Sequence, residues 1–117
     1  MSTVPLNPIE VFNKKTFSGY GEYVGRPGPL GNPYTHMKNH HNAPVKVKSR
    51  AEAIQRCDEW LDKALNEDTP QRSEFARLLR IYQTTGSLRL LCWCEPLPCH
   101  ARLIAKRLER AAGRKGR

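Results

Sequence analysis

The sequence LRLLCWCEPLPCHARLIAKRL, at residues 88–108, is the stretch that decides which fold we expect. Its apolar start, residues 88–93, lacks a strict alternation of apolar and polar side chains, which is typical of a strand buried on both faces. Prolines stiffen the turn that follows. A basic helix is expected to begin at Pro98 or Cys99 and to run to about Ala112. The stretch therefore predicts a strand, a turn and a helix.

Two more helices are expected before this strand. Ser49 and Glu52 form a capping box, in which each side chain accepts a hydrogen bond from a backbone N–H that the helix leaves unpaired. Thr69 as N-cap and Pro70 at the first helical position open the second helix, and Gly86 suits its left-handed C-terminal cap. Helix, strand and helix in this order predict a small α/β fold of three or two layers, with a short, at least partly parallel sheet and about three helices.

The N-terminal half supplies further strands and the domain boundaries. Residues 9–12 and 22–25 are predicted to form two short strands. A chain of 117 residues has room for one modest core. We expect a flexible N-terminal lead at residues 1–8, a single α/β domain at residues 9–112 and a basic C-terminal tail at residues 113–117.

The loop GRPGPLGNPY, residues 25–34, contains three Gly and three Pro and excludes a helix or a central strand. Such a loop can bring backbone N–H groups close to an anion, with Arg26 as a forked cationic donor. Gly31 and Asn32 are further candidates for ligand binding in it. The alternative is a rigid connector that packs the apolar side chains of the loop onto the core.

The net charge of +9 is unevenly distributed along the chain. Residues 1–50 carry +5, residues 51–101 carry −2 and residues 102–117 carry +6. This asymmetry favours a polyanionic partner such as nucleic acid, a nucleotide or an acidic protein. The alternative is a basic tail that only keeps the protein soluble.

Charged side chains of the helices are expected on solvated faces. Asp58 and Asp62 lie on the polar side of the first helix, away from the apolar face that includes Cys57. On the last helix, four basic side chains are expected to face outward: Arg102, Lys106, Arg107 and Arg110.

The sequence contains no membrane or export signal. No apolar stretch approaches the roughly 18 residues that span a bilayer. The first ten residues, MSTVPLNPIE, lack the basic start and apolar centre of a signal peptide. We therefore expect a cytoplasmic protein, in which cysteines stay reduced.

The candidate site follows from the parallel sheet, because ligands collect beyond the carboxyl ends of parallel strands. Cys92, Cys94 and Glu95 are expected at that edge, facing the first turn of the last helix. A helix N-terminus has unpaired N–H groups and a partial positive charge, which favour an anion. The residues expected to bind it are Arg26, Gly31, Asn32, Cys99, His100 and Arg102.

The same residues allow an enzyme that acts on a nucleotide, nucleoside or base. Cys99 or Cys94 would be the nucleophile, because a helix N-terminus and a neighbouring histidine lower the pKa of a thiol. His100 would carry the proton, or Glu95 would serve as acid or base.

A zinc site is a third alternative. On the spacing of the cysteines alone, we expect no cofactor rather than zinc. Its ligands would be Cys92, Cys94, Cys99 and His100, or a histidine of the polar segment at residues 36–48. Zinc sites usually use C-x2-4-C pairs, and successive strand residues point to opposite faces, so C-x-C is a tight spacing.

Two motifs carry a resemblance to a known family. The motifs G-R-P-x-P-L-G-N-P (residues 25–33) and C-x-C-x4-C-H (residues 92–100) resemble domain-of-unknown-function family 4326, found in bacteria and phages. The resemblance covers residues 9–108 and implies an α/β fold with a shared pocket, but no activity. The second motif is also similar to the C-x-E and C-H-R pattern of another uncharacterised α/β family; Cys94 replaces its glutamate and Ala101 its arginine.

The sequence therefore predicts a small basic protein that binds a phosphate-bearing ligand, either a nucleotide or nucleic acid. The alternatives are the Cys/His-dependent enzyme, a zinc-binding module, or a module that docks on a host protein. The expected location is the cytoplasm, that of the host if a phage encodes the chain. No pattern in the sequence indicates an oligomeric state.

Overall fold

The structure is a computed structural model that describes residues 4–25, 28–35, 45–92 and 100–114. It confirms the predicted α/β class. The elements follow in the order β1 (Glu10–Asn13), β2 (Glu22–Tyr23), β3 (Tyr34–Thr35), β4 (Val45–Lys46), α1 (Arg50–Ala64), α2 (Pro70–Thr85), β5 (Arg89–Cys92) and α3 (His100–Ala111).

The main sheet has β5 in the middle, with β1 and β2 on either side and parallel to it. The short parallel sheet predicted from the sequence is therefore confirmed. Leu90 and Cys92 point into the core that the helices share. Leu91 points to the opposite face, where a Cβ on Gly21 would lie 2.8 Å from Leu91 Cγ. All three side chains are buried, as expected of a strand covered on both faces.

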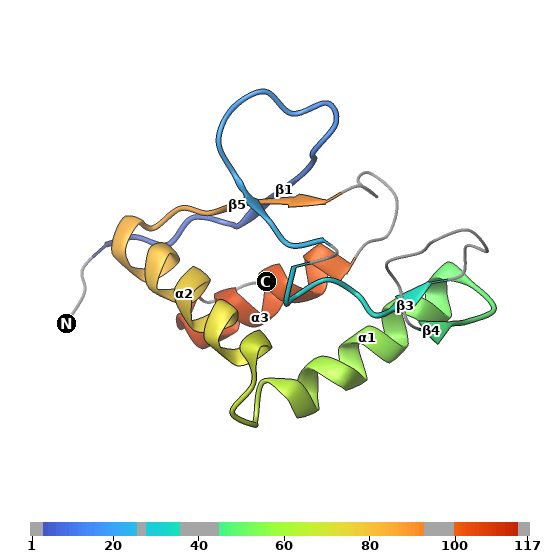
Figure 1. Cartoon of the computed structure of the whole chain (residues 1–117). Coiled ribbons are helices and arrows are strands. Elements are labelled where there is room, and N and C mark those ends of the chain that lie inside the picture. Colours follow the sequence, from blue (N-terminus) through green and yellow to red (C-terminus); the bar gives the residue numbers. More distant parts are fainter. Residues whose placement is uncertain (1–3, 26–27, 36–44, 93–99, 115–117) are drawn as a thin grey trace.

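The three helices lie on one side of the sheet, so the fold has two layers (Figure 1). α3 contacts β1 and β5 directly, α2 packs beside α3, and α1 lies next to β3. The core combines side chains from the sheet and from all three helices: Val24, Leu61, Leu78, Tyr82, Leu90, Ile104 and Leu108.

The helix boundaries agree with the predicted caps. Ser49 Oγ accepts a hydrogen bond from the N–H of Glu52 at 3.1 Å, and the Glu52 carboxylate accepts one from the N–H of Lys48 at 3.1 Å. At the start of α2, Thr69 Oγ1 accepts a hydrogen bond from the N–H of Arg72 at 3.1 Å. Gly86 ends α2 with a φ of 77°, the left-handed conformation that a C-terminal glycine permits.

The prediction that Arg107 faces outward was wrong. Its side chain is 19% exposed, and Nη2 lies 2.6 Å from Asp58 Oδ1 and 2.8 Å from Asp62 Oδ1. α1 packs against α3, so two carboxylates one helical turn apart on α1 come within reach of one guanidinium on α3. This contact depends on the tertiary arrangement of the helices, which the period of neither helix reveals.

A second, two-stranded sheet was not predicted. β3 and β4 pair in parallel, with Tyr34 beside Val45 and Thr35 beside Lys46. Their sequences read as loops because a two-residue strand carries too little alternation to detect. β3 contacts α1, so the pair connects the end of the Gly/Pro-rich loop to the first helix.

The segment expected as a flexible lead makes hydrogen bonds with the domain from Asn7 onward. The N–H of Asn7 donates to Gly86 O at 2.9 Å, and Tyr82 Oη donates to Asn7 O at 2.5 Å. The N–H of Ile9 donates to Glu109 Oε2 at 2.7 Å. Within the described residues, no helix is both long and apolar enough to cross a membrane.

Candidate functional site

The three parallel strands end together at one edge of the sheet, which we call the carboxyl edge: Asn13, Lys14, Tyr23, Val24 and Cys92. Backbone hydrogen bonds continue past the strands and hold their ends together. The N–H of Lys14 donates to Cys92 O at 2.7 Å, and the N–H of Val24 donates to Leu91 O at 3.0 Å. The Gly/Pro-rich loop leaves from this edge at Gly25.

His100 joins α3 to the carboxyl edge. Its Nε2 lies 2.7 Å from the backbone oxygen of Val24, and its side chain is buried. A carbonyl oxygen can only accept a hydrogen bond, so Nε2 carries a proton and donates it. The structure thus brings together the start of the Gly/Pro-rich loop and the N-terminus of α3, two segments in which the sequence predicted ligand-binding residues.

Tyr23 and Lys14 also lie at the carboxyl edge, and sequence reasoning missed both. Lys14 Nζ lies 4.3 Å from the centre of the Tyr23 ring, a cation–π contact. A Cβ on Gly25 would lie only 2.4 Å from Tyr23 Oη, so a side chain at Gly25 would have to displace the Tyr23 ring. The position of Lys14, two residues after the first predicted strand, was a signal that could have found it.

The chain matches the family described as domain of unknown function (DUF4326) over residues 11–110. It belongs to this family. The resemblance inferred from the two motifs is therefore confirmed. The family has no assigned function, so an activity has to be argued from the site. No curated protein and no solved structure matches the chain.

The Gly/Pro-rich loop of this DUF4326 domain is held by its own backbone and by α1. The N–H of Gly28 donates to Gly25 O at 3.0 Å, and the N–H of Gly31 donates to Gly28 O at 2.9 Å. Buried Asn32 donates from Nδ2 to Ala53 O at 3.1 Å. Gly31 and Asn32 therefore support the loop, and ligand binding by either of them stays a prediction.

The remaining predicted site residues divide into two groups. Cys92 lies at the carboxyl edge and is buried, whereas Arg102 lies in the first turn of α3 and is exposed. Arg26, Cys94, Glu95 and Cys99 lie outside the described residues. Among the residues that the structure describes, no group of three or more His, Cys, Asp or Glu side chains could hold a metal ion.

A polar cluster at the other end of β2 was not predicted at all. Tyr20 Oη donates to Glu22 Oε2, and Arg77 Nη2 lies 2.8 Å from Glu22 Oε1 and 2.7 Å from Glu74 Oε2. Burial raises the pKa of Glu22, but the hydrogen bonds from Tyr20 and Arg77 and the charge of Arg77 outweigh it, so the pKa lies below its ordinary value. The hydrogen bond to Glu22 raises the pKa of Tyr20.

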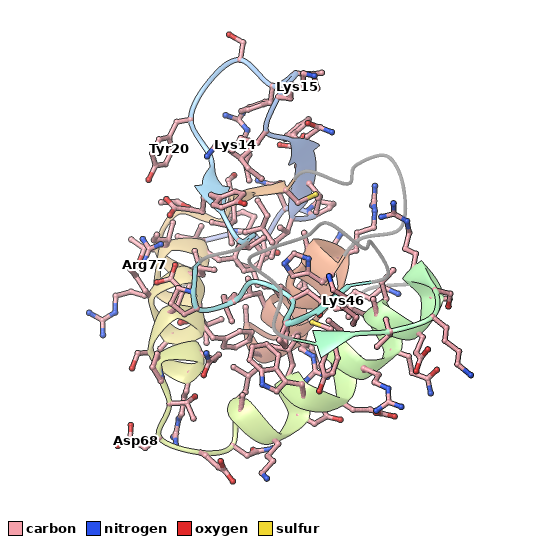
Figure 2. All side chains as sticks on the ribbon, turned by 45° about the vertical axis from the view of Figure 1, so that its right-hand side comes forward. Lys14, Lys15, Tyr20, Lys46, Asp68 and Arg77 are labelled. Atoms are coloured by element: carbon pink, nitrogen blue, oxygen red, sulfur yellow. The ribbon has the colours of Figure 1, made fainter. Side chains whose placement is uncertain are left out.

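This Tyr20–Glu22–Arg77 cluster is a fixed ionic group. Figure 2 shows Tyr20 and Arg77 on the same side of the molecule, with Asp68, in the turn between α1 and α2, lower on that side. The partners Glu22 and Arg77 are 55 residues apart in the sequence and on different elements, so no local pattern could have indicated their contact. Glu22 stays ionised and Tyr20 stays protonated around neutral pH, which is the arrangement of a structural support.

Proposed function

We propose that the chain is a small basic protein that binds a phosphate-bearing ligand, a nucleotide or nucleic acid, at the carboxyl edge. The observation that carries the proposal is the His100–Val24 hydrogen bond, which joins the N-terminus of α3 to the origin of the Gly/Pro-rich loop. In parallel α/β sheets, ligands bind beyond the carboxyl ends of the strands, and phosphates bind at helix N-termini.

The charges near this edge support an anionic ligand. Lys14 is exposed and lies against the Tyr23 ring, and Arg102 is exposed in the first turn of α3. The whole chain carries a net charge of +9, which raises the local concentration of a polyanion over a longer range. Arg26, whose position in the sequence directly follows Gly25, would add a forked donor.

Binding can be tested by fluorescence anisotropy with labelled nucleotides and short single-stranded DNA and RNA over a range of salt concentrations. Lys14→Gln is expected to weaken binding about three- to tenfold at low salt and to reduce the salt slope by about one. Lys63→Gln is the matched control, because Lys63 is equally exposed but lies in the last turn of α1, away from the carboxyl edge. Equal affinities of all three proteins, or no binding at low salt, would contradict the proposal.

One observation favours a second candidate function, a Cys/His-dependent enzyme acting on a nucleotide, nucleoside or base. Nε2 of His100 is engaged with Val24 O, so a proton carried by this ring at the carboxyl edge would have to use Nδ1. Cys99 or Cys94 would be the nucleophile, and Glu95 an alternative acid or base. Alkylation rates of the thiols, measured over a range of pH, distinguish the two functions. Loss of a fast-reacting thiol in Cys99→Ser or Cys94→Ser supports the enzyme. Ordinary pKa values for all the thiols contradict it.

We also propose a bacterial or phage origin and a cytoplasmic location; docking on a host protein is an alternative to ligand binding. A binding protein for nucleotides or nucleic acid would meet its ligand in the cytoplasm. A zinc site built from Cys92, Cys94, Cys99 and His100 is the metal-binding alternative, and elemental analysis of protein prepared without added metal tests it directly.

A further inference from the structure

A second concave site lies at the end of the sheet opposite the carboxyl edge. This pocket has a volume of about 240 Å³ and opens between the start of β5, the segment that enters β2, and α2. Its walls are formed by Tyr20, Gly21, Glu22, Ile81, Ser87, Leu88 and Arg89. Most of the lining is apolar, with charged groups at the rim.

The ring of Tyr20 forms an exposed wall of this pocket, and a hydrogen bond from its hydroxyl holds it there. Tyr20 is 77% exposed, so burial does not hold its ring. Its hydroxyl donates instead to Glu22, which is 8% exposed and is itself held by Arg77. An exposed aromatic side chain normally keeps its rotamer freedom, and losing that freedom costs entropy. The hydrogen bond to Glu22 restricts the ring of Tyr20, so less of this cost is left when the ring stacks on a flat ligand.

The charged groups at the pocket favour an anionic ligand over a cationic one. Both carboxylate oxygens of Glu22 already accept hydrogen bonds, from Tyr20 and from Arg77. Arg89 is 55% exposed at the rim, and its contact with Glu10 engages only Nε, so the outer nitrogens of the guanidinium can reach a phosphate or the edge of a base. Ser87, also at the rim, has a hydroxyl that can donate.

We infer that this pocket binds a nucleobase, which stacks on the ring of Tyr20. The inference rests on the proposed function for the choice of a nucleobase among flat aromatic ligands. At about 3.3 Å per residue, the four residues of β5 separate the pocket from the carboxyl edge by about 10 Å. Nucleotides stacked at the duplex rise of about 3.4 Å would cover that distance in about three steps, so one strand could place a base in the pocket and a phosphate at the carboxyl edge.

The test compares Tyr20→Leu, which keeps an apolar side chain but removes the π-face, with Tyr20→Phe, which keeps the ring and loses the hydrogen bond to Glu22. The probes are a labelled oligothymidylate, the same strand without bases, and a labelled mononucleotide. Tyr20→Leu is expected to weaken binding of oligothymidylate about five- to hundredfold, the value of one stacked base. Tyr20→Phe should lose less than Tyr20→Leu, and the baseless strand should bind the wild type and both variants alike.

The source of the base follows from the probes. If Tyr20→Leu also weakens the mononucleotide, free nucleotides use the pocket; if only the strand is affected, the base comes from nucleic acid. A strand carrying 5-iodouracil should crosslink to Tyr20 under ultraviolet light. Because Tyr20 is exposed, its variants are expected to fold, which thermal unfolding by circular dichroism checks.

The outcomes separate this inference from the proposed function. Oligothymidylate binding that responds to Lys14→Gln but is unchanged in Tyr20→Leu overturns the nucleobase pocket and leaves the carboxyl edge as the site. Binding that responds to Tyr20→Leu and not to Lys14→Gln supports the pocket and overturns the carboxyl edge. If the wild type binds none of the probes at low salt, both proposals are wrong.

Discussion

Nε2 of His100 lies 2.7 Å from the backbone oxygen of Val24, a residue 76 positions earlier in the chain. The bond connects the first residue of α3 to the residue after β2, at the edge where the parallel strands end. Both groups are buried, so neither can exchange this partner for water without opening the structure. The position of His100 is therefore set by the fold, and any chemistry at this edge has to use a histidine with that fixed orientation.

Replacing His100 by Ala should destabilise the fold. The change removes a buried ring and leaves Val24 O without this donor, and together these effects are expected to lower the free energy of unfolding by about 2–4 kcal/mol. Urea denaturation measures the loss. Lys106→Ala on the exposed face of α3 is the control and should change the stability by less than about 0.5 kcal/mol. Equal urea midpoints for His100→Ala and the wild type would show that the bond contributes nothing.

A side chain at Gly25 is expected to destabilise the fold. A Cβ at this position would lie 2.4 Å from Tyr23 Oη and 2.6 Å from Tyr23 Cζ, so Gly25→Ala has to displace the ring and is expected to cost about 1–3 kcal/mol. Gly28→Ala is the matched control: its Cβ would meet only Gly25 O, at 3.1 Å, and a smaller loss is expected. In the double variant with Tyr23→Ala the cost of Gly25→Ala should largely disappear, and additive losses would contradict the clash.

The predictable part of the fold is local. The capping residues Ser49 and Thr69, the C-terminal Gly86 and the apolar run before Cys92 act through backbone positions within a few residues, so their patterns predicted α1, α2 and β5. The order of these elements then predicted the parallel sheet and its carboxyl edge. The pair β3–β4 carried no such pattern, because two residues are too few.

The unpredictable part consists of contacts between distant elements. Arg107 with Asp58, and Glu22 with Arg77, each join side chains from elements whose relative placement no local period specifies. The orientation of His100 belongs to the same class: the sequence placed it at the N-terminus of α3 but could not show that its ring donates to Val24. The contact between Lys14 and Tyr23 was missed for the same reason, because it depends on the order of the strands in the sheet.

The ion pairs of Arg107 should connect α1 and α3 measurably. Its side chain is largely buried between the helices, so Arg107→Ala loses packing as well as two ion pairs and is expected to cost about 1–2 kcal/mol. Because the carboxylates of Asp58 and Asp62 are 50% and 71% exposed, each pair should contribute below about 1 kcal/mol. A double-mutant cycle of Arg107→Ala with Asp58→Asn, read by urea denaturation at low and high salt, should give a coupling that salt weakens. A coupling of zero at low salt would mean that the contact between Arg107 and Asp58 contributes nothing to the free energy of unfolding.

The Tyr20–Glu22–Arg77 cluster should make the stability depend on acid pH. The folded-state pKa of Glu22 lies below its ordinary value of 4.5, so the carboxylate stabilises the fold at pH values above about 4.5. That contribution is lost as the pH falls through the folded-state pKa. Glu22→Gln is therefore expected to be less stable than the wild type by about 1–2 kcal/mol at neutral pH, with a difference that shrinks below about pH 4. Urea denaturation at a series of pH values measures it. Glu67→Gln, which alters an exposed carboxylate in the turn between α1 and α2, is the control and should follow the wild-type curve at a constant small offset. Parallel curves for Glu22→Gln and the wild type through the acid range would show that the cluster does not hold Glu22 ionised.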